Sequence, residues 1–218
     1  IVMEAVRILK AVGIKPKRTI RVGLWGGEEQ GLYGSQQYVH DHLATRPDGT
    51  DERLKYLAPI AAQNFGGYPI TPKKGHERFS VYFNMDHGSG KIRGIYAEEN
   101  AAAAKLFEDW FLPFHDLGAT KVTLNKTLAT DHVVFDQAGL PGFTFLHEPL
   151  DYFSRLHHTQ LDVLNNAYEK DLKQASVILA SFLYNAAMRD ERMPRKPLPT
   201  GPADFSKDYD KTDKENDQ

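Results

Sequence analysis

Two adjacent glutamates, Glu28 and Glu29, follow an apolar run and lie among glycines. The run, residues 20–25, is rich in β-branched and large apolar residues, which predicts a strand buried inside an α/β sheet. Ligands bind at the carboxyl ends of strands in open α/β sheets, so we expect both carboxylates at such an edge. Burying two neighbouring carboxylates without a cation is costly, which favours a nearby metal ion with one glutamate as ligand and the other as proton carrier. The simpler alternative is a solvated pair in the first turn of a surface helix.

Further candidate ligands follow at other chain positions. Asp86 ends an alternating stretch, residues 79–86, and is followed by a turn at 87–90, while His157 and His158 stand in a polar stretch before the last helix. Carboxylate and imidazole without thiolate form the ligand set of a hydrolytic zinc or manganese site. Taken singly, Asp86 is more typical of a turn and His158 of a surface histidine. If these residues lie together at one edge of the sheet, a metal site is favoured over a turn role for Asp86 and a surface role for His158.

Composition limits the classes of function. The chain has 218 residues, is 41% hydrophobic and can fill one core, so one domain is expected. A net charge of −2 gives no reason to expect nucleic acid or an anionic membrane as partner. The absence of cysteine excludes disulfides, thiolate metal sites and cysteine nucleophiles. No apolar run reaches the length of a membrane span.

Helical and strand patterns alternate along the chain, which predicts an α/β fold. A stretch at 46–78, with a short helical segment at 54–62, is expected as a surface excursion. Residues 191–218 are rich in proline and then in charge, which predicts an extended or disordered tail. The expected helices are 1–12, 32–43, 100–117, 130–138 and 169–188, and the expected strands are 19–25, 79–86, 91–96, 121–124 and 140–146.

Four short motifs occur in a fixed order: GEEQGLYGS at 27–35, NMD at 84–86, TDH at 130–132 and HTQLD at 158–162. Together they resemble the signature of the co-catalytic zinc exopeptidases, the family of bacterial leucyl aminopeptidase and the glutamate carboxypeptidases. The residues in these motifs are most similar to those of bacterial relatives of plasma glutamate carboxypeptidase. The resemblance implies a three-layer αβα sandwich around a mixed, mostly parallel sheet, two zinc ions in the intact site, and a peptide or dipeptide substrate.

The resemblance also implies roles for single residues. Glu28 would be the general base and acid, Glu29 and His158 would bind one zinc ion, and Asp86 would bind the other. In some relatives a tyrosine precedes the ligand histidine, whereas this chain has His157 there. The remaining motif and neighbouring residues would orient the ligands or contact substrate, with Tyr152 or His157 as a donor to the oxyanion; they are Thr130, Asp131, His132, Tyr152, His157 and Asp162.

One departure from the family pattern concerns the start of the chain. The family has a histidine in an H-x-D motif and a carboxylate that bridges both metals, and neither has a match here. A helical pattern already begins at Ile1 without an N-cap. We therefore expect an N-terminally truncated chain, with residues 1–190 as the C-terminal part of a catalytic domain, that binds metal poorly and is inactive alone.

Two other functions stay open. Glutaminyl cyclase resembles the same family, uses one zinc ion and transfers an acyl group within its substrate. A non-catalytic binding module would explain the missing ligands. A homodimer or a docked N-terminal segment is a possible partner, and the resemblance implies a periplasmic or secreted protein.

Overall fold

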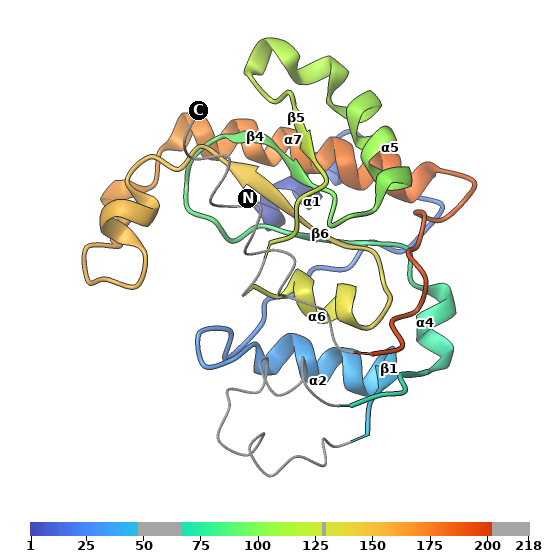
Figure 1. Cartoon of the computed structure of the whole chain (residues 1–218). Helices are drawn as coiled ribbons and strands as arrows, with labels where there is room; N and C mark the ends of the chain where they lie inside the picture. The colour runs from blue at the N-terminus through green and yellow to red at the C-terminus, as the bar shows by residue number, and fades with distance from the viewer. Residues whose placement is uncertain (48–66, 128–129, 202–218) are drawn as a thin grey trace.

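The main sheet has four strands in the order β3-β6-β4-β5 (Figure 1). The computed structural model describes residues 1–47, 67–127 and 130–201. Strand β3 runs parallel to β6 and β4 runs parallel to β5, whereas β4 and β6 are antiparallel. Two of the three pairings are therefore parallel, as the predicted mixed sheet requires. The strands are β3 (Tyr82–Asn84), β6 (Gly142–His147), β4 (Ile92–Tyr96) and β5 (Lys121–Thr123).

Helices cover both faces of this sheet (Figure 1). On one face, α1, α5 and α7 enclose a core of aromatic and aliphatic side chains that includes Phe107, Phe143 and Phe182. On the other face, α6 packs against β3 and β6, and α2 packs against α6. The predicted three-layer α/β fold is confirmed. These helices are α1 (Val2–Ala11), α2 (Tyr33–His42), α5 (Ala101–Phe111), α6 (His132–Gln137) and α7 (Glu169–Met188).

The shorter elements refine the predicted pattern. The expected helix at 100–117 divides where Pro113 follows Leu112, and its second part is a 3-10 helix, because proline cannot donate the helical hydrogen bond. The expected helix at 54–62 lies outside the described residues, and the later part of the excursion forms β2 and α4. The remaining elements are β1 (Ala44–Thr45), β2 (Thr71–Pro72), α4 (Lys74–Arg78), η2 (Leu112–Leu117), η3 (Tyr152–Leu156) and η4 (Leu164–Asn166).

The predicted strand at 19–25 is not formed, so this prediction was wrong. Residues 19–25 belong to no helix or strand, and within the described ranges β3 pairs with β6 alone. A strand exists through the backbone hydrogen bonds of a neighbour, and an apolar, β-branched sequence does not supply them. Val22 and Leu24 are consequently 41% and 75% exposed, although Trp25 turns inward toward Tyr82.

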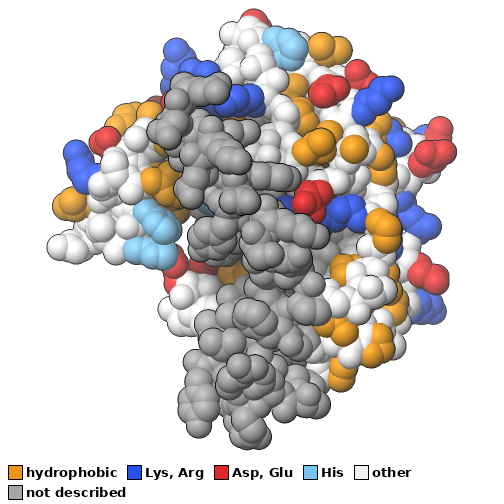
Figure 2. All heavy atoms as spheres, in the orientation of Figure 1, with side chains coloured by type: hydrophobic (Ala, Val, Ile, Leu, Met, Phe, Trp, Pro, Cys, Tyr) orange, Lys and Arg blue, Asp and Glu red, His pale blue; other side chains and the backbone are white. Residues whose placement is uncertain are grey.

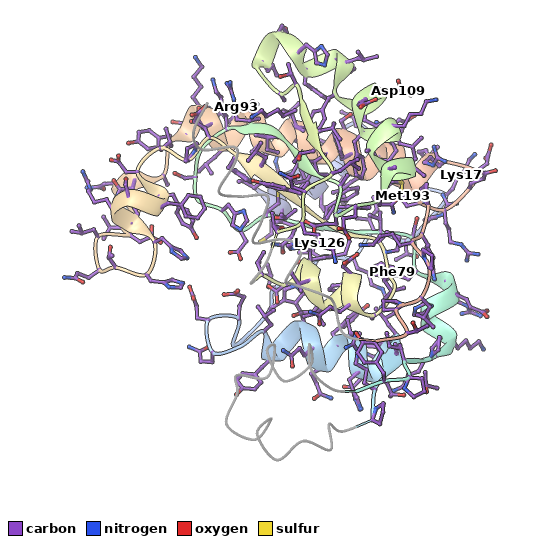
Figure 3. All side chains as sticks on the ribbon, in the orientation of Figure 1. Lys17, Phe79, Arg93, Asp109, Lys126 and Met193 are labelled. Carbon is purple, nitrogen blue, oxygen red and sulfur yellow. The ribbon has the colours of Figure 1, made fainter. Side chains whose placement is uncertain are left out.

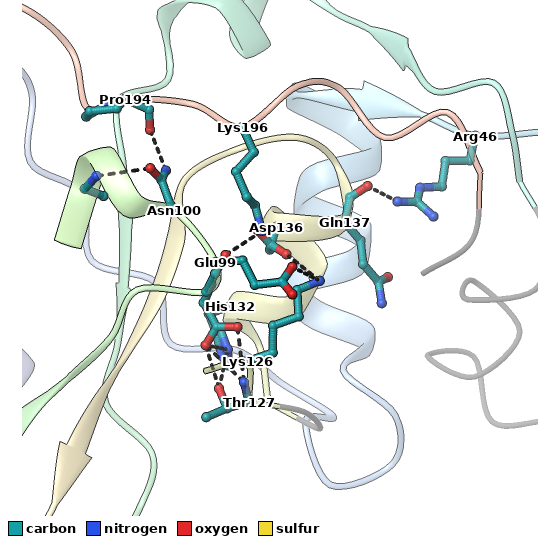
Figure 4. Close-up of polar contacts among 12 residues, drawn as sticks. Arg46, Glu99, Asn100, Lys126, Thr127, His132, Asp136, Gln137, Pro194 and Lys196 are labelled. Carbon is teal, nitrogen blue, oxygen red and sulfur yellow. Dashed lines mark hydrogen bonds and ion pairs between the residues drawn. The ribbon is translucent and has the colours of Figure 1, made fainter. Parts of the chain in front are cut away.

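The segment after α7, residues 189–201, lies against the body of the molecule as a strap. Met193 is 2% exposed, and Figure 3 shows it between the helical layers, whereas Lys17 lies at the periphery. The Asn100 side-chain amide donates to Pro194 O (2.9 Å), and Lys196 Nζ donates to Glu98 O (2.7 Å; Figure 4). The strap is therefore extended and bound along its length by main-chain and side-chain contacts.

Candidate active site

A tight loop presents the two glutamates immediately before α2. Gly27 and Gly31 have φ angles of 68° and 122°, where a side chain is disfavoured. A Cβ on Gly34 would lie 2.8 Å from the backbone of Gly26, so only glycine permits this approach. Backbone N–H groups donate to Glu28 O at 2.8 and 2.9 Å and close the loop. Since α2 begins at Tyr33, the glutamates precede the helix and are not in its first turn.

The Glu28-Glu29 loop meets a distant segment, the arm, defined as residues 149–168. Glu29 Oε2 and His158 Nε2 lie 2.9 Å apart. The His157 ring stacks on that of His158, with ring centres 3.7 Å apart. Figure 1 places the arm as the projection on the left, and Figure 2 shows histidine side chains gathered there with acidic side chains beside them. The predicted ligand pair is thus brought together, and both side chains are exposed.

Asp86 follows β3, and residues outside the arm hold its carboxylate. The Thr130 hydroxyl donates to Asp86 Oδ2 (2.5 Å), and the Asn84 side-chain amide donates to Thr130 Oγ1 (2.8 Å). Asn84 and Thr130 are both buried. Thr130 was predicted to orient a ligand by hydrogen bonding, and its position beside Asp86 supports that role.

Electrostatic effects link these groups into one site. Burial raises the pKa of Glu28 to about 7, and the negative charges of Asp86, Asp131 and Glu29 add to the rise, whereas His158 opposes it. Burial and the nearby carboxylates, Asp86 first among them, raise the pKa of Tyr152 to about 12. A carboxyl group that titrates near neutral pH beside other carboxylates is suited to proton transfer.

The residues predicted to contact substrate or orient ligands have different positions. The Tyr152 hydroxyl donates to Asp86 O (3.3 Å), and the ring centres of Tyr152 and His157 are 5.1 Å apart. The side chain of Asp162 is exposed, and in the described residues its carboxylate makes no hydrogen bond to His158. The prediction that Asp162 orients a ligand therefore finds no contact to support it.

Asp131 and His132 are buried beneath the site. His132 Nε2 lies 3.1 Å from Glu98 Oε1 and 2.8 Å from Thr127 Oγ1 (Figure 4). Burial raises the pKa of Asp131, and within the described part of the chain its Oδ1 atom has no hydrogen-bond partner. His132 thus anchors the segment that leads to Thr130 and does not belong to the exposed ligand pair.

Sequence reasoning missed Glu98, which is buried although its type is usually exposed. It follows β4 in the left-handed backbone region, with φ 49°, and accepts hydrogen bonds from the backbone N–H and the hydroxyl of Thr127. Its place just after a predicted strand was the available signal. The same signal identified Asp86.

A divalent cation fits part of this arrangement. Two ligand atoms bonded to one zinc ion at about 2 Å lie about 3.3 Å apart at tetrahedral angles, close to the separation of Glu29 Oε2 and His158 Nε2. Within the described ranges, no three His, Cys, Asp or Glu side chains are arranged to hold a metal ion. Glu29 and His158 can therefore supply two ligands to one ion, with Asp86 available to another.

The family model described as peptidase family M28 matches residues 1–183. The chain belongs to peptidase family M28. This confirms the resemblance inferred from the four motifs, and it covers the whole of the site described above. No helix in the described part of this M28 chain is long and apolar enough to cross a bilayer.

The curated relatives of this chain are considerably longer than the chain itself. Carboxypeptidase Q of Mus musculus is 27% identical over 192 residues, which is 88% of this chain and 34% of the relative. Aminopeptidase YwaD of Bacillus subtilis (strain 168) is 24% identical over 194 residues, which is 88% of this chain and 37% of the relative. The chain therefore spans about a third of the length of the curated relatives it matches.

Solved structures share the fold. A peptidase M28 precursor from Shewanella amazonensis SB2B has a TM-score of 0.67 and 23% identity, covering 91% of this chain and 37% of that one. BSAP, a zinc aminopeptidase from Bacillus subtilis, has a TM-score of 0.57 and 20% identity, covering 86% and 40%. Both likenesses concern the arrangement of helices and strands in an M28 fold.

Proposed function

We propose that the protein is a zinc-dependent exopeptidase that removes terminal residues from peptides or splits dipeptides. The observation that carries the proposal is the meeting of Glu29 and His158, 2.9 Å apart, directly beside Glu28. Family membership supports a hydrolase. The names of the relatives, a carboxypeptidase and aminopeptidases, one of them a zinc enzyme, support an exopeptidase and zinc.

In this proposal Glu28 moves the proton. Zinc, when bound, supplies Lewis-acid polarisation of the scissile carbonyl. Glu28 takes a proton from the attacking water and passes it to the leaving amine, because its pKa of about 7 lets it exchange a proton near neutral pH. Tyr152 lies beside Asp86 with a protonated hydroxyl and is our candidate donor to the oxyanion.

Glu29 and His158 would hold one zinc ion, and Asp86, held by Thr130, would bind the second. A catalytic zinc ion usually takes three protein ligands, and the described residues bring two together. We therefore expect weak zinc binding and little hydrolysis from the 218 residues alone, and tight binding of two zinc ions in the longest natural form of the protein.

The test measures zinc per chain after dialysis and hydrolysis of peptides, on this chain and on the longest natural form. Substrates carry a free or blocked amino terminus and a free or blocked carboxyl terminus, which separates aminopeptidase from carboxypeptidase activity. We expect hydrolysis to require zinc and to be lost in Glu28→Gln. The matched control is Glu77→Gln, because Glu77 is exposed on α4, away from the site.

Each alternative has its own outcome in that experiment. A peptide with N-terminal glutamine that cyclises without loss of a residue would replace hydrolysis by acyl transfer. Zinc binding and hydrolysis absent from both forms would contradict the peptidase proposal and leave a binding module.

We also propose that the protein acts in the periplasm or after secretion, as the family resemblance implies. Cell fractionation followed by detection of the protein tests this, and recovery from the cytoplasm alone would contradict it.

The exposed arm is a candidate for contact with a second copy or another segment, which sedimentation of the natural protein would reveal.

A further inference from the structure

A chain of four side-chain hydrogen bonds runs from the start of the Glu28-Glu29 loop to Asp86. Trp25 Nε1 donates to the Tyr82 hydroxyl oxygen (3.0 Å), and that hydroxyl donates to Asn84 Oδ1 (2.6 Å). Asn84 Nδ2 then donates to Thr130 Oγ1 (2.8 Å), and the Thr130 hydroxyl donates to Asp86 Oδ2 (2.5 Å). The chain joins two parts of the site that are 61 positions apart in the sequence, from 25 to 86.

The direction of every bond in this chain is determined by its two ends. The indole N–H of Trp25 can only donate, so the Tyr82 oxygen must accept and its proton must go to Asn84. This fixes the amide of Asn84 with its oxygen toward Tyr82 and its NH₂ group toward Thr130. The Thr130 proton is then left for the Asp86 carboxylate, which in its ionised form can only accept.

The surroundings of Tyr82 hold the chain in place. Its ring stacks on Phe135 with ring centres 4.4 Å apart and an interplanar angle of 18°. Tyr82 and Asn84 are two positions apart on β3, so their side chains point to the same face of the sheet. Burial raises the pKa of Tyr82, which keeps the hydroxyl protonated and able to donate.

We propose that Tyr82, with Trp25, is a positioning residue that sets the orientation of the Asp86 carboxylate toward its metal ion. Tyr82 lies outside the four motifs, and neither residue contacts the ligand atoms directly. The arrangement leaves one Asp86 oxygen bonded to Thr130 and the other available as a ligand. Because Trp25 immediately precedes the loop, the same chain links the placement of Asp86 to that of the two glutamates. The part that concerns metal rests on the proposed function.

Tyr82→Phe removes the central hydroxyl and keeps the stacked ring. The matched control is Tyr38→Phe, since Tyr38 lies in the same aromatic cluster and its hydroxyl accepts from Arg21 instead of joining the chain. Melting temperatures and amide spectra establish that both variants fold. The first readout below uses this full chain, and the second uses the longest natural form of the protein.

The first readout requires neither bound metal nor enzymatic activity. The chain contains two tryptophans, Trp25 and Trp110, so two indole N–H resonances report their hydrogen bonds. We expect Tyr82→Phe to shift the Trp25 indole resonance and, at fixed pH 8, the side-chain carboxylate ¹³C resonance of Asp86. Tyr38→Phe should leave the Asp86 resonance unchanged. If the Asp86 resonance is unchanged in Tyr82→Phe, the proposal is overturned, whatever reaction the protein catalyses.

The second readout is zinc affinity by calorimetry in the longest natural form. Loss of a residue that orients a ligand typically weakens metal binding by about 10- to 100-fold. We expect a loss near the upper end for Thr130→Val, of about 10-fold for Tyr82→Phe, and none for Tyr38→Phe. Equal affinities for the two tyrosine variants would overturn the positioning role. A wild-type protein without zinc binding would instead overturn the proposed function, and the first readout would still decide the orientation of Asp86.

Discussion

The two sides of the candidate site are built differently. Asp86 accepts a hydrogen bond from Thr130, which in turn accepts one from Asn84, and both of these partners are buried. Glu29 and His158 come from a loop and an arm, are 64% and 61% exposed, and meet through one contact. Ordered hydrogen bonds fix a side chain before a ligand arrives, whereas an exposed pair contributes little stability by itself. The Asp86 side is therefore organised by the fold, whereas the proposed ligand pair of Glu29 and His158 would need a bound ion to fix its geometry.

The largest expected effect is on the rate of hydrolysis, and it comes from changing Glu28, the proposed proton carrier. Glu28→Gln keeps the size of the side chain and removes its ability to take a proton, so we expect the rate of peptide hydrolysis to fall by about 1,000-fold. Zinc affinity should stay within about 2-fold, because the substitution leaves Glu29 and His158 in place. Steady-state kinetics and calorimetry on the zinc-loaded natural protein measure both. A rate that falls only in proportion to zinc occupancy would contradict the assignment of Glu28.

A change on the exposed side should affect metal binding without affecting the fold. His158→Ala removes one of the two proposed zinc ligands that meet, so we expect zinc affinity to fall by at least about 100-fold. The free energy of unfolding of the metal-free chain should change by less than about 0.5 kcal/mol, because the pair is solvent-exposed. Calorimetry and urea denaturation test the two parts, with the exposed His40→Ala as the matched control.

A change on the buried side should affect both metal binding and the fold. Thr130→Val keeps the shape of the side chain but leaves the amide of Asn84 buried without its acceptor. We expect the metal-free chain to lose about 1–3 kcal/mol of stability. Urea denaturation measures this loss. A variant as stable as His158→Ala would contradict the contrast between the two sides.

The smallest expected effect is a dependence of stability on pH. The pKa of Glu28 is raised to about 7 in the folded chain, above its usual value of 4.5. The folded state therefore holds the proton more tightly, and the stability associated with Glu28 is present below pH 4.5 and is lost as the pH rises to 7. After allowance for solvent, we expect Glu28→Gln to stabilise the metal-free chain at pH 8 by about 1 kcal/mol. Urea denaturation at pH 5 and pH 8 measures this, and a stabilisation that is equal at both pH values would contradict it.

Much of the fold was accessible from the sequence because the patterns concerned are local. The apolar spacing predicted α1, α2 and α7 to within one residue at each end. The prediction of a strand at 19–25 was wrong because the formation of a strand is not decided locally. Its composition favours a strand, but the decision rests with a neighbouring strand that local sequence does not reveal.

The candidate site divides in the same way. Glu28, Glu29 and Asp86 follow from residue types at the ends of apolar runs, and His158 follows from its motif. Glu98 and Tyr82 were not predicted, since one resembles a surface acid and the other a strand aromatic. Their roles come from the partners that the fold places beside them.

The sequence by itself determined the residue types of the candidate site, their order and the α/β alternation that positions them, because these are properties of short segments. Only the tertiary structure decided which side chains meet: Glu29 with His158, Thr130 with Asp86, and Trp25 with Tyr82. Such contacts join residues dozens of positions apart, and the packing of the sheet against α6 and of the loop against the arm creates them.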